Sequence, residues 1–130
     1  MRFLLDTHVA IWLLTEPSRI PAEIFDLIAD PDNSVFVSVV SIWETAIKFR
    51  LGRADSPPFS GSAAIAHFET AGFSLLDIKA THAAFVERLP PIHQDPFHRL
   101  MLAQSIVEGM QFVTYDQRLS RYDAAVLTWP

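Results

Sequence analysis

The feature that most constrains the fold is the alternation of short apolar runs with segments of helical spacing. In these runs apolar residues do not alternate with polar ones. Such runs fit strands whose two faces are both buried, as in parallel sheets. The sequence therefore predicts an α/β fold with a central, mostly parallel sheet of about five strands and helices on both faces. The expected strands are Arg2–Leu5, Val35–Val39, Phe73–Ile78, Phe112–Thr114 and Ala124–Leu127.

Helices are expected between these runs, and several have clear start or stop signals. Pro17 ends the first, and Gly52 and Gly72 follow two others. Asp95 fits an N-cap and Pro96 the first helical position of the longest helix. The expected helices are Val9–Leu14, Pro21–Ala29, Ser41–Arg50, Ala63–Ala71, Ala80–Leu89 and Pro96–Gly109, with a loop over Ala54–Gly61.

Length and composition predict a single globular domain and a cytoplasmic location. The 130 residues fit a single domain over 1–130, and 50% of them are hydrophobic, enough for a core. The absence of cysteine excludes disulfides, thiolate metal sites and cysteine nucleophiles, and it fits a reducing compartment. No apolar run approaches the ~20 residues of a membrane-spanning helix. We therefore expect a cytoplasmic protein without a membrane partner.

The formal net charge of −5 argues against a nucleic-acid binder, which usually has a basic face. That objection weakens if several of the acids are clustered around metal, because bound cations reverse the local charge. Basic residues also follow the candidate acids described below, at Lys48, Arg99 and Arg118. They can contact phosphates beside a metal site, although each one alone is explained equally well as solvated helix surface.

Four acids fall where a parallel sheet places its ligands. Asp6 and Asp116 each lie at the carboxyl end of a predicted strand. Glu44 and Asp95 each lie in the first turn of a predicted helix. Ligands of open α/β sheets bind beyond the carboxyl ends of the strands. These carboxylates are therefore expected to meet at one edge of the sheet.

Crowded carboxylates suggest metal chemistry. Like charges a few ångströms apart raise one another's pKa, and a divalent cation removes that cost. Hard oxygen ligands favour Mg²⁺ or Mn²⁺. Such an ion lowers the pKa of a bound water and stabilises an in-line phosphoryl displacement. The acids therefore indicate hydrolysis of phosphodiester bonds by an activated water.

Each acid also has a purely structural interpretation. Asp6, Asp95 and Asp116 can each cap the helix that follows them. Ser41 and Glu44 have the spacing of a capping box. The two interpretations are compatible, because a carboxylate can cap with one oxygen and bind metal with the other.

Acidic motifs follow one another in four segments, Leu4–Trp12, Ser38–Lys48, His93–Gln104 and Phe112–Asp116. In order and spacing, and over nearly the whole chain, they resemble the motifs of PIN domains of the VapC toxin type. The resemblance implies an endoribonuclease that depends on Mg²⁺ or Mn²⁺, commonly the toxin of a toxin–antitoxin pair. It also implies three partners: RNA, a separately encoded antitoxin and a second copy of the chain.

The resemblance assigns roles to individual residues. Metal binding would fall to Asp6, Glu44 and Asp116. We expect Thr7, Arg99 and Thr114 to line the site, with Thr114 hydrogen-bonding within it.

The third motif departs from the family pattern. It reads Asp-Pro-Phe-His-Arg, so that His98 stands where these proteins usually have their third acid. Asp95 lies one helical turn earlier on the same face. Either Asp95 takes the acidic role, or His98 binds metal through a neutral imidazole, or the site is weakened. The expected ligand set is therefore Asp6, Glu44, Asp95, His98 and Asp116, with Asp95 also among the catalytic acids.

Three functions remain open at this stage. The favoured one is the ribonuclease, with an apolar, Trp-bearing surface on the first and third helices as a place for partners. The second is a binding or interaction module on the same fold, whose catalysis was lost with the third acid. The third is another α/β metal-dependent phosphohydrolase, which is less favoured because no Asp-x-Asp pair lies at a strand end and no glycine-rich phosphate loop is present. His93 is expected to contact substrate or simply to lie in a loop.

Overall fold

The computed structural model of the chain describes residues 1–122 and 125–130. Its strands form one five-stranded sheet in the order β3-β2-β1-β4-β5, and all neighbouring strands are parallel. The predicted α/β class and parallel sheet are therefore confirmed. The strands are β1 (Arg2–Leu5), β2 (Ser34–Ser38), β3 (Ser74–Leu76), β4 (Gln111–Val113) and β5 (Val126–Leu127).

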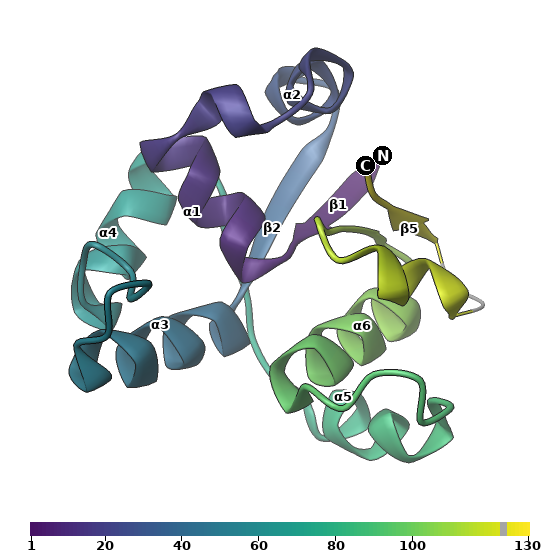
Figure 1. Cartoon of the computed structure of the whole chain (residues 1–130). Helices are drawn as coiled ribbons and strands as arrows, with labels where there is room; N and C mark the ends of the chain where they lie inside the picture. The colour runs from purple at the N-terminus through teal and green to yellow at the C-terminus, as the bar shows by residue number, and fades with distance from the viewer. Residues whose placement is uncertain (123–124) are drawn as a thin grey trace.

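Helices cover the sheet on both sides, as Figure 1 shows: α1, α2 and α4 lie on one side, and α5 and α6 on the other. Short 3-10 turns supplement them at η1 (Pro17–Arg19), η2 (Val86–Arg88) and η3 (Gln117–Arg121). The α-helices are α1 (Thr7–Thr15), α2 (Ala22–Ala29), α3 (Val39–Leu51), α4 (Gly61–Thr70), α5 (Ala80–Phe85) and α6 (Pro96–Glu108). None of them is long and apolar enough to cross a membrane, within the part of the chain that the structure describes.

Side chains of the central strand β1 pack into two separate hydrophobic cores. Phe3 and Leu5 pack into a hydrophobic cluster with the helices on one side, and Leu4 packs into a second cluster on the α6 side. This alternation follows from the two-residue period of a strand. All three side chains are fully buried, which explains why the strand reads as a continuous apolar run.

Helix α3 begins earlier than the sequence predicts. It starts at Val39, directly after β2, because the Ser38 hydroxyl accepts the N–H of Val40 and caps the helix. The capping box predicted for Ser41 and Glu44 is therefore wrong. The Ser41 hydroxyl instead bonds that of Thr7 on α1, at 2.8 Å. Glu44 lies in the second turn of α3, not in the first.

Other predicted boundaries shift by a few residues. The helix predicted over Ala80–Leu89 leaves α-helical geometry after Phe85 and continues as η2. The strand predicted over Phe73–Ile78 pairs only at Ser74–Leu76. The last predicted strand is present as β5, whereas its proposed first residue, Ala124, lies outside the described residues.

Helices α3 and α4 approach closely at Gly61, the first residue of α4. A Cβ added there would lie 2.8 Å from the Cβ of Ala46 and 3.2 Å from the carbonyl oxygen of Ile42. We predict that Gly61→Ala lowers the free energy of unfolding by about 1 to 3 kcal/mol, because the two helices must separate. Urea unfolding measures this, with Ser62→Ala on the exposed side of the same turn as the matched control. Equal stability of the two variants would contradict the close packing.

Candidate active site

Two paired strands and one helix start meet at the carboxyl edge of the sheet. Asp6 follows β1, Asp116 follows β4, and His98 is the third residue of α6. The pairing of β1 with β4 continues past the strand ends, because the N–H of Asp6 donates to the carbonyl oxygen of Val113 at 2.8 Å. The parallel register therefore brings Asp6 and Asp116 together from opposite ends of the chain.

Asp6 is held at both carboxylate oxygens. Its Oδ1 accepts the N–H of Thr7 at 2.7 Å and caps α1, and its Oδ2 accepts the Thr114 hydroxyl at 2.7 Å. The hydrogen bond expected of Thr114 is thus present. The same Oδ2 lies 3.3 Å from His98 Nε2. Burial acts to raise the pKa of Asp6, but His98 and the Thr114 hydroxyl outweigh it and lower that pKa. Asp6 is therefore an ionised carboxylate inside the protein.

His98 lies among the carboxylates. Its side chain is only 10% exposed, and its Nδ1 lies 3.7 Å from Asp95 Oδ2 and 3.9 Å from Asp116 Oδ2. Burial acts to lower the pKa of His98, but the bond to Asp6 and the charges of Asp6, Asp95 and Glu44 raise it to about 9. The helix dipole at the start of α6 opposes this shift and does not prevent it. Without metal, His98 is a cation at neutral pH.

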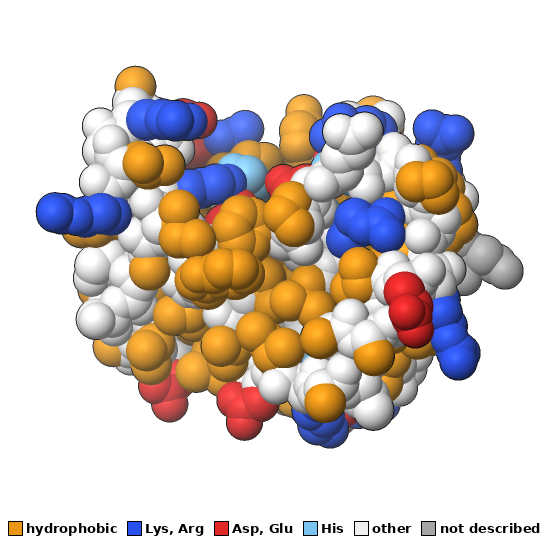
Figure 2. All heavy atoms as spheres, turned by 90° about the horizontal axis from the view of Figure 1, so that it is seen from below, with side chains coloured by type: hydrophobic (Ala, Val, Ile, Leu, Met, Phe, Trp, Pro, Cys, Tyr) orange, Lys and Arg blue, Asp and Glu red, His pale blue; other side chains and the backbone are white. Residues whose placement is uncertain are grey.

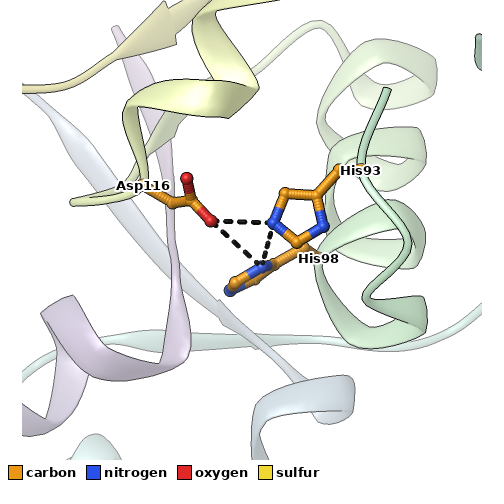
Figure 3. A group of neighbouring side chains, drawn as sticks. All are labelled: His93, His98 and Asp116. Atoms are coloured by element: carbon orange, nitrogen blue, oxygen red, sulfur yellow. Dashed lines mark hydrogen bonds and ion pairs between the residues drawn. The ribbon is translucent and has the colours of Figure 1, made fainter. Parts of the chain in front are cut away.

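Asp116 faces the rings of His93 and His98, as Figure 3 shows, and it also pairs with Arg118. Its Oδ2 lies 2.7 Å from His93 Nε2, and both of its oxygens contact the Arg118 guanidinium, at 2.9 and 2.7 Å. The Arg118 bonds lower the pKa of Asp116 most strongly; burial opposes them, and His93 adds to them. Asp116 also caps η3 through the N–H of Arg118.

Glu44 lies deeper than the other acids. Its side chain is 1% exposed, and its Oε2 pairs with the ammonium group of Lys48, one turn further along α3. Its Oε1 is buried and has no hydrogen-bond partner among the described residues. A buried carboxylate oxygen without a donor is costly unless a cation approaches it.

The two carboxylate oxygens of Asp95 have different partners, as the sequence suggested. Its Oδ1 accepts the N–H groups of Phe97 and His98 and caps α6. Its Oδ2 is the oxygen that faces the imidazole of His98. One carboxylate therefore starts the helix and adds negative charge beside the other acids.

Arg99 and Thr7 occupy different positions from those expected of residues that line the site. The Arg99 guanidinium donates to four main-chain carbonyls between Val86 and His93, at 3.0 to 3.3 Å, and so holds the loop before α6. The Thr7 hydroxyl is buried against Ser41 and joins α1 to α3. Both residues hold the main-chain segments that carry the site and do not line the cleft themselves.

A cleft of about 720 Å³ opens above the acids. Three of the predicted site residues, Asp6, His98 and Asp116, contribute to its walls, whereas Glu44 and Asp95 do not. The cleft is lined by Asp6, His8, Trp12, His98, Tyr115, Asp116, Gln117, Arg118 and Pro130. In Figure 2 acidic and histidine side chains lie in a hollow near one rim, with lysine and arginine on both sides of it.

The donor set fits a hard or borderline divalent metal. Carboxylates are the commonest of the candidate ligands, and the buried Oε1 of Glu44, which has no hydrogen-bond partner among the described residues, can accept a further contact from a cation. His93, His98 and Asp116 can also bring one ligand atom each within 4.8 Å of one another. These three side chains, with the Asp6 carboxylate 3.3 Å from His98 Nε2, form the place where the residues present fit a divalent ion.

Sequence reasoning gave little weight to His93, although the structure places it in contact with Asp116 and His98. Its side chain is buried, and it comes from the loop before α6. The only signal in the sequence was its place two residues before a helix cap, which does not reveal the direction of a loop side chain.

Comparison with known proteins agrees with this geometry. The PIN domain family model matches residues 3–125, and the chain belongs to the PIN-domain family. The α/β phosphohydrolase of another type, left open from the sequence, is thereby excluded. The chain is 32% identical, over 97% of each sequence, to "Ribonuclease VapC22" of Mycobacterium tuberculosis.

Solved structures share the fold at low sequence identity. The VapBC2 complex of Rickettsia felis, bound to a promoter DNA fragment, contains a chain that superposes over the full length of both chains with a TM-score of 0.73 at 13% identity. The DNA-bound VapBC of Salmonella typhimurium gives a TM-score of 0.68 at 15% identity, over 100% of this chain and 99% of that one.

The position of His98 predicts how the stability of the metal-free protein depends on pH. Because its pKa rises from 6.5 to about 9 on folding, its contribution is complete below pH 6.5 and is lost as the pH rises through about 9. The stability advantage of the parent over His98→Asn should therefore shrink between about pH 6 and about pH 10. Urea unfolding in the presence of EDTA measures it. A difference that stays constant over this range would contradict the ion pair with Asp6.

Proposed function

We propose that the chain is a metal-dependent endoribonuclease and the toxin of a toxin–antitoxin pair. The observation that carries the proposal is the meeting of Asp6, His98 and Asp116 in one cleft at the carboxyl edge of a PIN-family sheet. The relative named as a ribonuclease, which matches nearly the whole chain, supports the choice of RNA as substrate.

The residues would share the work as follows. Asp6 and Asp116, with Glu44 behind them, would hold Mg²⁺ or Mn²⁺. When bound, that ion supplies an activated water and stabilises charge on the phosphate. Thr114 and the N–H of Thr7 keep the Asp6 carboxylate fixed. His98 occupies the position where the family pattern has an acid. Asp95 would supply negative charge beside it.

Arg118 would change partners during the cycle. It neutralises Asp116 in this structure, yet its side chain is 68% exposed. With Asp116 engaged in holding the metal, the Arg118 guanidinium would be available for a backbone phosphate of the RNA. Lys48 is likewise paired with an acid that would hold the metal, Glu44, and its ammonium group would become available in the same way. The negative net charge of the chain is then no obstacle to RNA binding.

A non-catalytic module is the second candidate, and one observation favours it. His98 fills the third acidic position and forms an ion pair with Asp6, so that a cation of the chain itself occupies part of the space for metal. Titration of the protein with Mn²⁺ by calorimetry separates the two candidates, because a scaffold without a metal site gives no site-specific heat.

The surface for protein partners would lie on α3. Trp43, Ile47 and Leu51 are spaced by four residues along one side of this helix and are 53%, 38% and 55% exposed. Figure 2 shows hydrophobic side chains gathered on this side of the molecule, which is the view from below Figure 1, where α3 and α5 lie. Trp43 also packs edge-on against Phe97 of α6. An apolar surface of this kind fits a second copy of the chain or an antitoxin segment.

Helix α1 does not contribute to this surface as the sequence suggested. Val9, Ala10 and Ile11 are buried in the core. Trp12 is half-buried between the Arg19 guanidinium and Tyr115. The partner surface is therefore proposed for α3 alone.

The metal proposal predicts that Asp6→Asn removes both metal affinity and RNA cleavage. The loss should exceed about 100-fold, the upper end for residues that only support a ligand. Calorimetry with Mn²⁺ and cleavage of a fluorescent RNA measure the two quantities. Asp26→Asn, on the exposed side of α2, is the matched control and should behave as the parent. A folded Asp6→Asn protein with parental cleavage would refute the mechanism.

The partner proposal predicts that Ile47→Lys gives a monomer where the parent is a dimer. A lysine at the centre of the apolar surface places a charge in the interface. Sedimentation at high micromolar concentration reports the mass. Leu27→Lys on α2 is the matched control, because its side chain is equally exposed, at 38%, and belongs to another helix. A monomeric parent, or an Ile47→Lys variant that stays dimeric, would contradict this surface.

A further inference from the structure

His93 occupies an unusual place among the candidate ligands. Its ring is buried, and both of its nitrogens have near neighbours. Its Nε2 lies 2.7 Å from Asp116 Oδ2 and 3.2 Å from His98 Nδ1. Its Nδ1 lies 3.0 Å from the main-chain nitrogen of Asp95. Figure 3 shows the ring turned toward Asp116, beside the ring of His98.

The contact with Asp95 fixes where the ring carries its proton. A main-chain N–H can only donate, so Nδ1 of His93 must accept and must be without a proton. A neutral imidazole with a bare Nδ1 carries its proton on Nε2. That N–H points toward Asp116 Oδ2, the nearer of its two neighbours, and donates to it. The 3.2 Å contact with Nδ1 of a charged His98 is then not a hydrogen bond, because both nitrogens carry protons, and the His98 N–H faces the Asp95 and Asp116 carboxylates instead.

This assignment conflicts with metal binding by His93. A metal-bound imidazole uses the lone pair of one nitrogen and donates the N–H of the other to an acceptor. If Nε2 bound a metal, Nδ1 would need a proton, and that proton would face the N–H of Asp95. His93 therefore fits a hydrogen-bond donor to a ligand better than a ligand, although its Nε2 is close enough to share an ion with Asp116 and His98.

The loop is built to keep His93 in this orientation. The N–H of His93 donates to the Tyr122 hydroxyl at 3.0 Å, and its carbonyl oxygen accepts from Arg99 at 3.3 Å. The Arg99 guanidinium also contacts the Tyr122 hydroxyl. These contacts tie the main chain on either side of the ring to α6 and to the end of η3.

We propose that His93 is a positioning residue, held with its proton on Nε2 by the main chain of Asp95, and that it orients the Asp116 carboxylate without binding metal itself. Its effect on the metal centre depends on the proposed function, whereas its protonation form does not. Of the two histidines, only His98 is then available to a metal.

Two-bond ¹H–¹⁵N correlation spectra test the protonation form directly, because protonated, bare and metal-bound ring nitrogens have distinct ¹⁵N shifts. Spectra of the metal-free protein should show His93 with a bare Nδ1 and a protonated Nε2, and saturating Mg²⁺ or Zn²⁺ should leave this pattern unchanged. A proton on Nδ1 in the metal-free protein, or coordination of Nε2 after metal is added, would overturn the proposal. Comparison with His93→Gln assigns the signals.

Two variants test the positioning role. The amide nitrogen of His93→Gln can replace Nε2 and still donate to Asp116, whereas His93→Asn reaches only as far as Nδ1 and keeps only the contact with Asp95. Affinity for Mn²⁺ by calorimetry should stay near the parental value in His93→Gln and fall by about 10-fold or more in His93→Asn. Equal affinities of the two variants would overturn the positioning role. A parent that binds no metal would instead refute the proposed function, and the spectra of the metal-free protein would still decide the protonation form.

Discussion

The structure depends on the balance of charge where the sheet ends. Parallel pairing of β1 with β4 fixes Asp6 and Asp116 at one edge, and Glu44 is buried behind them. Carboxylates at this depth repel one another unless each has a counter-charge. The chain provides one cation for each of them: His98 for Asp6, Lys48 for Glu44 and Arg118 for Asp116. A divalent ion would take the place of several of these partners at once.

The groups that stabilise the fold at this edge are therefore the same ones proposed to bind the metal. Asp6, Asp95 and Asp116 each use one oxygen to cap a helix and direct another toward the neighbouring ionised groups. Capping fixes the carboxylate before any ligand arrives, which lowers the entropy cost of assembling a metal centre. Three further residues hold these groups in place: His93 contacts Asp116, Thr114 contacts Asp6, and Arg99 holds the loop before α6.

The sequence allowed the fold and the placement of Asp6 and Asp116 at one edge of the sheet to be predicted, because strand ends and caps are local signals. Continuous apolar runs identified the parallel strands, and acids directly after them identified the edge. The capping box of Ser41 and Glu44 failed because tertiary contacts compete with local ones: Ser38 already caps α3, and Ser41 bonds Thr7 across the core. The contacts of Arg99 and His93 could not be predicted for a related reason. Their partners are main-chain atoms of a loop, and residue types do not encode how a loop folds back.

The central claim is that these carboxylates form one metal centre, with His93 beside it as a donor. Anomalous diffraction from a crystal soaked in Mn²⁺ tests this most directly. The account predicts an anomalous peak at coordination distance from carboxylate oxygens of Asp6 and Asp116, with His93 Nε2 still in contact with Asp116. A peak coordinated by His93, or no peak near Asp6 in a protein that binds Mn²⁺ in solution, would contradict it.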